Sequence, residues 1–543
     1  MKKIIYYAVA GWLLTLGAGC TNLDVNVNSK YTTYPNSPIA LEAMEADVFY
    51  AFRNALGVNY NVAQSLSSDE EVGISFDGDY YDKAVYAHPT LHNFLPDDGC
   101  LSYYSDLGSG ITKCNTLIET YGDQTTSAAQ ARAMRAFYHF ILMDSFGDTP
   151  IIDKLAEGGT SLDRSPRAEV AKWIEKELLE IIPSLPSNVD ETTYGKPTRW
   201  MAEALLVKLY LNWAVYTAKD VTAYEPSDAN EKLDDCVKYC DDIIKSGHFN
   251  LSDPYRSKFF PDNGYQIKDF IYAMPYDCVT ETGMHYERYR TWRKTDGGGD
   301  DGSTTYYGDK GVKSFGGNIS LTPEFASLFN LEGDDRNGVI LRDTIYQYDA
   351  TTREKTGKVW TYKGKPVVLQ KNITLKANKD GIVENPEFLN TGATVTGWSQ
   401  GYKSMKFWVC TSDYKNDRNQ SNDVPIFRYA DIILEKAEAI LRGASATNGQ
   451  TPMSLMNEIR SYVHAPLLTT APTLQDLLDE RGREFITENW RRNDLIRFGK
   501  FEDEWGFHKK GFNTVRFDKT CRIFPIPTSV LNLNTNWVQN PGY

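Results

Sequence analysis

Hydrophobic residues recur at helical spacing in several separate stretches of the chain. The first clear stripe consists of Ala131, Met134, Tyr138, Ile141 and Leu142. Ser127 with Gln130 predicts a capping box ahead of it. Further stripes run over residues 170–182, 198–217, 228–245, 430–441 and 474–485. The pattern therefore predicts a series of amphipathic helices.

Local signals mark the ends of these helices. Ser165 followed by Pro166 predicts one helix start, and Thr473 with Asp476 predicts a capping box at another. Gly247 and Gly443 follow helix ends. Because the helices come as neighbours joined by short connections, we expect helix pairs stacked in the manner of an α-solenoid, although no tetratricopeptide consensus recurs at a fixed period.

The stretch from about residue 250 to 424 has a different pattern. Short β-like runs at 270–274 and 358–362 are interrupted by turn residues throughout. We predict a mainly α fold with three parts: a helical block over 20–249, an irregular region with short strands over 250–424, and a helical block over 425–543.

The N-terminus has the pattern of an export signal. Lys2 and Lys3 precede an apolar run over 4–16 and the small-residue site Gly17-Ala18-Gly19-Cys20. This predicts a lipoprotein signal peptide of residues 1–19, with Cys20 as the lipidated residue. Buried acyl methylenes contribute about 0.8 kcal/mol each, so several chains hold a protein on a membrane. No later apolar run reaches the roughly 18 residues of a spanning helix.

Charge and composition narrow the class of ligand. The formal net charge of −14, without a basic stripe, argues against a nucleic-acid partner. The chain contains 34 tyrosines and 11 tryptophans, whose flat rings serve both core packing and ligand stacking.

Cysteine and histidine patterns favour no metal site or cofactor. If Cys20 carries lipid, the other seven of the eight cysteines cannot all pair. Cys236 and Cys240 share an apolar helix face, which predicts small buried side chains rather than ligands. His88 and His92 are separated by Pro89 and are weak metal candidates. The acidic run at 296–301 lacks the EF-hand spacing, so a calcium site there stays open.

Several blocks carry a family resemblance. They are residues 131–138 with 146–150, 196–198 with 202–211, 334–336, 428–439, 480–499, 522–527 and 539–543. Together they resemble the SusD/RagB family of outer-membrane nutrient-binding lipoproteins. The resemblance implies a SusD-like helical scaffold and a lipid-anchored position on the outer membrane, facing outward. It also implies capture of a glycan and delivery to a SusC-like TonB-dependent transporter, with the protein acting as a hinged lid.

The charged residues of the block at 480–499 are expected to have a structural role rather than a catalytic one. Glu480 with Arg483, and Arg481 with Glu484, have i,i+3 spacing on one predicted helix. Guanidinium groups can hold carboxylates and carbonyls in a buried lattice. We assign no catalytic residues.

A glycan site needs aromatic platforms together with polar side chains that direct hydrogen bonds. In SusD-like proteins the ligand face is built from an early loop and the irregular region. The matching residues here are Asp77, Asp79, Tyr80, Tyr81, Tyr286, Arg288, Tyr289, Trp292, Arg293 and Tyr306. Taken singly, each aromatic residue is equally consistent with half-buried packing.

Two other functions stay open. The first is binding of a peptide or another nutrient in the same transport system. The second is glycoside hydrolysis, which needs two carboxylates about 5 to 10 Å apart across a cleft. No Gly-x-Ser-x-Gly, His-Glu-x-x-His or P-loop motif is present. The sequence does not specify the sugar or its linkage.

Overall fold

The computed structural model describes residues 37–155, 162–293, 305–309, 315–512 and 514–543. The predicted signal peptide, Cys20 and the acidic run at 296–301 lie outside these residues. Residues 44–543 form one compact unit, and residues 37–43 belong to a separate unit. None of the described helices is both long enough and apolar enough to cross a bilayer.

Helices supply most of the regular structure. The longer ones are α2 (Pro38–Phe49), α6 (Tyr103–Tyr121), α7 (Thr126–Phe146), α8 (Arg167–Ile181), α9 (Arg199–Leu211), α11 (Leu233–Ser246), α16 (Tyr429–Leu441), α17 (Pro452–Tyr462) and α18 (Leu474–Phe485). The shorter ones are α3 (Arg53–Ala55), α4 (Asn61–Leu66), α5 (Ala87–Thr90), α10 (Trp213–Thr217), α12 (Tyr286–Arg290), α13 (Pro323–Ala326), α14 (Val395–Trp398), α15 (Thr411–Tyr414), α19 (Arg491–Arg497) and α20 (Thr528–Leu533).

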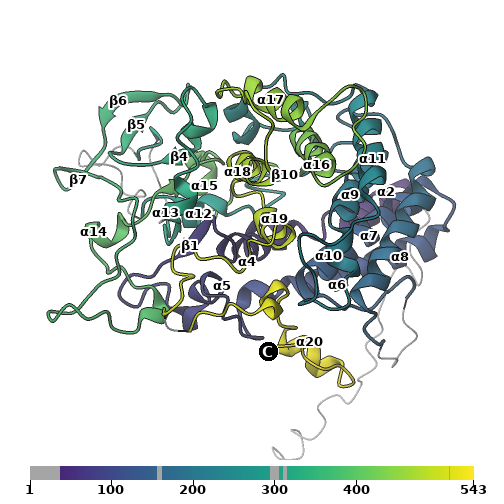
Figure 1. Ribbon diagram of the computed structural model, residues 1–543, viewed down its shortest axis with the longest axis horizontal. Coiled ribbons are helices and arrows are strands. Elements are labelled where there is room, and N and C mark those ends of the chain that lie inside the picture. Colours follow the sequence, from purple (N-terminus) through teal and green to yellow (C-terminus); the bar gives the residue numbers. More distant parts are fainter. Residues whose placement is uncertain (1–36, 156–161, 294–304, 310–314, 513) are drawn as a thin grey trace, which may run out of the picture. The chain divides into compact units, whose positions relative to one another are not determined.

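Neighbouring helices pack against one another in series. Helix α6 packs on α7, α7 on α8, α9 on α11, α11 on α16, and α16 on α17. Figure 1 shows α6 to α11 gathered at the right. Cys236 and Cys240 are buried on the inner face of α11, as their spacing predicts. The prediction of a mainly α fold is confirmed.

Helix boundaries confirm some sequence signals and correct others. Thr473 and Asp476 form the predicted capping box of α18. The predicted box at Ser127 is wrong, because the Thr125 hydroxyl accepts the Ala128 N–H and caps α7 instead. Ser165 is not a cap either.

A carboxylate from the preceding turn replaces Ser165 at the start of α8. Ser165 pairs its backbone with Thr149, and the Asp148 carboxylate accepts the Arg167 N–H at 2.8 Å. Helix α11 begins at Leu233, five residues later than expected, and ends at Ser246, just before Gly247, which has a φ of 70°.

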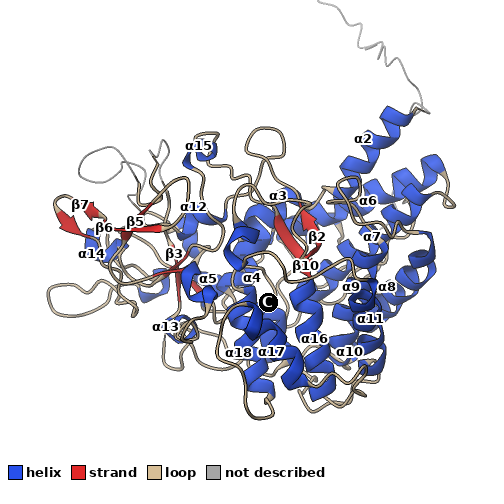
Figure 2. Ribbon diagram, turned by 90° about the horizontal axis from the view of Figure 1, so that it is seen from above, coloured by secondary structure: helices blue, strands red, loops and turns tan. Residues whose placement is uncertain are grey.

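Strands are short and pair in twos. The antiparallel pairs are β1 (Glu71–Gly73) with β3 (Ile319–Leu321), β2 (Phe270–Met274) with β10 (Val424–Arg428), β4 (Ile340–Leu341) with β9 (Lys403–Ser404), β5 (Tyr346–Tyr348) with β6 (Lys355–Val359), and β7 (Thr361–Tyr362) with β8 (Lys365–Pro366). In Figure 2, β5 to β7 lie on the opposite side of the body from helices α6 to α11. The predicted runs at 270–274 and 358–362 are strand segments, the second divided at Trp360.

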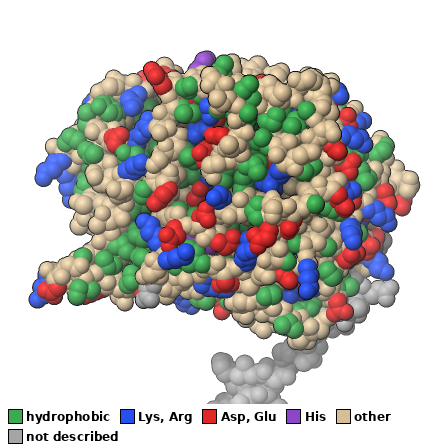
Figure 3. All heavy atoms as spheres, in the orientation of Figure 1, with side chains coloured by type: hydrophobic (Ala, Val, Ile, Leu, Met, Phe, Trp, Pro, Cys, Tyr) green, Lys and Arg blue, Asp and Glu red, His purple; other side chains and the backbone are tan. Residues whose placement is uncertain are grey.

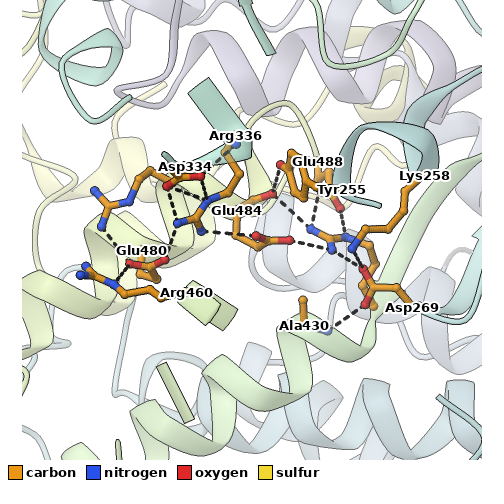
Figure 4. A network of polar contacts seen from close by, with 12 residues as sticks. Tyr255, Lys258, Asp269, Asp334, Arg336, Ala430, Arg460, Glu480, Glu484 and Glu488 are labelled. Atoms are coloured by element: carbon orange, nitrogen blue, oxygen red, sulfur yellow. Dashed lines mark hydrogen bonds and ion pairs between the residues drawn. The ribbon is translucent and has the colours of Figure 1, made fainter. Parts of the chain in front are cut away.

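A buried ionic network joins the irregular region to the C-terminal helices (Figure 4). At its centre, the Arg428 guanidinium contacts Asp269 at 2.6 Å, Glu484 at 2.9 Å and Glu488 at 2.8 Å. Asp269 also accepts the Ala430 N–H at 2.9 Å, at the start of α16. The charge of Arg428 at the end of β10 is therefore neutralised inside the protein by one carboxylate that precedes β2, one on α18 and one that follows α18.

A second guanidinium extends the network into the irregular region. Arg336 contacts Asp334 at 2.8 Å, Glu480 at 2.6 Å and Glu484 at 3.4 Å. Glu480 also pairs with Arg483 at 2.9 Å, as the i,i+3 spacing predicts.

The predicted pair of Arg481 with Glu484 is wrong. Arg481 instead contacts Asp431 of α16 at 2.7 Å and Asp494 of α19 at 2.8 Å. Because Arg481 is fully buried, carboxylates on neighbouring helices can surround it. Asp431 also receives Lys208 of α9 at 2.7 Å, which links the two helical blocks.

We expect Glu484→Gln to lower the free energy of unfolding by about 3–5 kcal/mol, because it leaves Arg428 and Arg336 with less buried counter-charge. Guanidinium-induced unfolding would measure the loss. Glu332→Gln, at an exposed position, is the matched control and should change stability by about 0.5 kcal/mol or less. Equal stability of the two variants would contradict a structural role for the network.

The network should also make stability depend on acid. Burial opposes ionisation of Glu480, but Arg336, Arg483 and Arg460 outweigh it and lower its pKa from 4.5 to about 2. A carboxyl with a depressed native pKa stabilises the fold above its unfolded pKa, and that stabilisation disappears as the pH falls toward the native pKa. We expect Glu480→Gln to flatten the decline in unfolding free energy between about pH 4.5 and 2, while Glu332→Gln leaves its slope unchanged.

Candidate functional site

The early loop after β1 begins with a tight turn. Asp77 and Gly78 have φ values of 51° and 100°, and Phe76 donates its N–H to the Asp79 carbonyl at 3.0 Å. Two consecutive positive φ values define a primed hairpin turn, for which Asp-Gly is a preferred pair. The turn projects Asp77 and Asp79 toward solvent, and both side chains are exposed.

Asp77 connects this loop to a distant segment. Its carboxylate accepts hydrogen bonds from Lys376 at 2.7 Å, Asn390 at 3.1 Å and the Ala393 N–H at 3.0 Å. These bonds lower the pKa of Asp77 to about 2, with Lys376 as the largest cause. Beside it, the Tyr81 ring stacks on Phe388, with 4.5 Å between centroids and 10° between planes.

Arg293 connects the same loop to the segment that follows α12. Its guanidinium forms an ion pair with Asp79 and lies 4.8 Å from the Phe76 ring and 5.6 Å from the Tyr80 ring. The two stretches selected from the sequence therefore meet in space. We call the surface formed by Asp77, Asp79, Tyr81, Arg293, Lys376 and Phe388 the early-loop face.

Beneath the early-loop face lies a row of tyrosines. Tyr80 meets Tyr86 edge-on at 5.5 Å, and Tyr86 lies 6.0 Å from Tyr289 of α12. The Arg288 guanidinium is 5.1 Å from the Tyr289 ring centroid. Because Tyr289 is only 5% exposed, this row mainly supports the surface above it.

The remaining predicted residues lie in the core. Trp292 and Tyr306 have no exposed area, and they belong to one cluster with Trp360. The Trp292 indole donates to the Ser399 hydroxyl at 3.1 Å. Tyr286 is also buried and donates to the Leu56 carbonyl. A ligand role for these three rings stays a prediction. None of the three rings has a face exposed to solvent in the structure.

Sequence reasoning missed Lys376, Phe388 and Asn390. These residues lie about 300 positions from their partners in the early loop, as in the pair Lys376 with Asp77. No spacing rule connects segments so far apart. The aromatic residue in the turn-rich stretch around Phe388 is the one local signal available. Among the described residues, no group of three or more His, Cys, Asp or Glu side chains is arranged to hold a metal ion.

Comparison with known proteins shows which family this chain resembles. A family model described as the SusD family matches residues 268–543, and one described as "Starch-binding associating with outer membrane" matches residues 23–211. The starch-binding protein SusD of Bacteroides thetaiotaomicron is 25% identical over 462 residues, covering 81% of this chain and 78% of that protein.

Solved structures agree on the fold. A laminarin-binding SusD-like protein superposes with a TM-score of 0.68 and 21% identity, covering 93% of this chain and 99% of that one. Surface glycan-binding protein A of Bacteroides thetaiotaomicron, in complex with laminarihexaose, gives a TM-score of 0.66 and 18% identity, with coverages of 93% and 99%. The chain therefore shares the overall fold of these two structures. The chain belongs to the SusD family.

Stability measurements should separate the core ring from the surface ring. We expect Trp292→Ala to cost about 3–5 kcal/mol, because it empties a large site in the core. Tyr81→Ala should cost about 1 kcal/mol or less, because it removes one stacked pair at the surface. Chemical unfolding of both variants is the measurement. A Trp292→Ala protein as stable as Tyr81→Ala would contradict the core position of Trp292.

Proposed function

We propose that the protein is a glycan-binding lipoprotein of the outer membrane. The observation that carries the proposal is membership of the SusD family, combined with the early-loop face. Relatives are named for binding starch, laminarin and other surface glycans. We propose that the chain captures an oligo- or polysaccharide outside the cell and passes it to a SusC-like TonB-dependent transporter, anchored through lipid on Cys20.

The early-loop face has chemistry suited to a sugar. The stacked Tyr81 and Phe388 rings supply an apolar platform for the C–H face of a pyranose. Asp77, held ionised by its neighbours, supplies acceptor oxygens for hydroxyl groups, and Lys376 and Arg293 supply donors. A few such contacts give modest affinity with rapid release, which suits delivery.

Binding without hydrolysis fits the same groups better. A glycosidase needs one carboxylic acid that stays protonated near neutral pH. The Asp77 carboxyl has the opposite property, since its pKa is lowered to about 2. Asp77 is therefore unsuited to be that acid, and we propose no catalytic residue at the early-loop face.

The division of the chain is part of the proposal. Residues 20–249 and 425–543 would form the scaffold, and residues 250–424 with the early loop would present ligand. In the described residues, strands β2 to β9 all lie between 250 and 424. The lid-like opening about a hinge near Cys20 is proposed from family resemblance and would require a stable complex with the transporter.

Affinity electrophoresis and calorimetry against a panel of polysaccharides, with a peptide mixture beside them, would test the proposal. We expect one glycan to bind and Tyr81→Ala to weaken it about three- to tenfold, the value of one stacked aromatic contact. Tyr265→Ala is the matched control, because Tyr265 is 50% exposed and lies outside the early-loop face.

The outcomes separate the alternatives. Glycan binding that Tyr81→Ala weakens and Tyr265→Ala preserves supports both the function and the site. Glycan binding that neither variant changes would move the site elsewhere. Binding of peptide alone would favour another nutrient as cargo, and release of free sugar would favour a hydrolase.

A further inference from the structure

A pocket of about 350 Å³ lies beside the hairpin β5–β6, away from the residues of the early-loop face. We call it the basic pocket. Its lining includes the cations Arg256, Arg342, Arg353 and Lys355 and the rings of Tyr346 and Tyr348. Its volume is at the lower end of the range of small-ligand sites, about 300–1,000 Å³. The two surfaces share no residue.

The lining of the basic pocket has a surplus of positive charge. Arg256, Arg342, Arg353 and Lys355 face a single carboxylate in the lining, that of Glu354. Arg353 is neutralised by an ion pair with Asp262 at 2.7 Å. Within the described chain, no carboxylate lies within 4.0 Å of the charged nitrogens of the other three cations.

Two of these cations are held in place by neutral groups. Arg256 donates to the Gly338 carbonyl at 2.8 Å and to the Met405 carbonyl at 3.3 Å. Arg342 donates to the Phe329 carbonyl at 2.8 Å. Such bonds orient a guanidinium without cancelling its charge, so both groups can still attract an anion.

This arrangement differs from that of most buried arginines in the described chain. The chain carries a formal net charge of −14, and buried guanidinium groups such as those of Arg290, Arg336 and Arg428 contact one or more carboxylates. Carboxylates are therefore abundant, yet one contacts Arg353 and none contacts its neighbours in the basic pocket. Figure 3 shows several Lys and Arg side chains at the left and upper left, where Figure 1 labels β5 to β7.

Aromatic rings accompany the charges. Register places Lys355 opposite Tyr348 across the hairpin, and the Lys355 ammonium is 5.0 Å from the Tyr346 ring centroid. Arg353 lies 4.3 Å from the Phe260 ring centroid. Tyr348 packs edge-on against Trp408 at 5.3 Å, which fixes its ring. Half-buried rings beside uncompensated cations fit a sugar ring that carries an anionic substituent.

We propose that the basic pocket is a second glycan subsite, which selects sugars bearing a carboxylate or a sulfate group. The inference rests on the proposed glycan-binding function and adds a chemical class of ligand to it. The pocket's three uncompensated cations would contact the anionic group, and Tyr346 and Tyr348 would contact the sugar ring.

The test uses the purified protein and a panel of uronic-acid, sulfated and neutral polysaccharides, compared by affinity electrophoresis and calorimetry. For the best acidic binder, we expect Lys355→Gln and Arg342→Gln each to weaken binding about tenfold, the effect of one charged hydrogen bond. Lys358→Gln is the matched control, because it removes the same charge from β6 at an exposed position outside the lining. Comparing the uronic-acid and the sulfated polysaccharides shows whether the pocket prefers a carboxylate or a sulfate group.

Neutralised ligand provides a second measurement. Methyl esterification or desulfation of the same polysaccharide should weaken binding by wild type and should abolish the difference between wild type and Lys355→Gln. Equal binding of the acidic ligand by Lys355→Gln, Arg342→Gln and Lys358→Gln would overturn the subsite. Binding of neutral glycans alone would overturn it while leaving the proposed function intact, whereas binding of no glycan at all would overturn both.

Discussion

The constraint on which this structure depends is the need to neutralise charge inside a large helical body. Removing an unpaired guanidinium from water is costly, so buried arginines such as Arg428, Arg481 and Arg497 meet carboxylates at close range. Arg492 is an exception, because it donates to the Cys521 carbonyl instead. Those carboxylates come from different elements: Asp269 precedes β2, Asp431 lies on α16, and Asp494 lies on α19. The ionic network therefore fixes which elements can be neighbours. Apolar packing alone is less selective, because it does not require a particular partner.

This fixed scaffold gives the surface loops their positions. Arg290, at the end of α12, pairs with Glu71 of β1 at 2.6 Å. That contact holds together the start of the early loop and the segment that leads to Arg293. The early-loop face is thus built on two anchored stems, while its own side chains are exposed or half-buried. The basic pocket follows the same principle, since its hairpin packs on the cluster of Trp292, Trp360 and Trp408.

Local sequence signals predicted local structure well. The apolar stripes located α7 to α11, α16 and α18, although they gave no signal for α2, α6 or α17. The Thr473 capping box and Gly247 were correct because their contacts lie within one turn. The errors came where a distant group competed. Asp148 displaced Ser165 as a cap, and Asp431 displaced Glu484 as the partner of Arg481. The same limit applies to the site. Composition pointed to Asp77, Tyr81 and Arg293. The burial of Trp292 and the position of Phe388 beside Tyr81 depend on tertiary packing, which local sequence does not show.

Partners far apart along the chain also set the order in which the molecule can be completed. The Asp69 carboxylate accepts a hydrogen bond from Arg491 at 2.7 Å, and the Asn61 amide donates to the Asn489 side-chain oxygen at 2.7 Å, across 422 and 428 residues respectively. Until the last tenth of the chain is available, the early segments carry polar groups whose partners do not yet exist. High sequence separation slows folding, because the chain loses the entropy of a long loop before the contact can stabilise it. The C-terminal signature is therefore also needed to complete the fold. A chain truncated before it lacks the partners of Asp69 and Asn61.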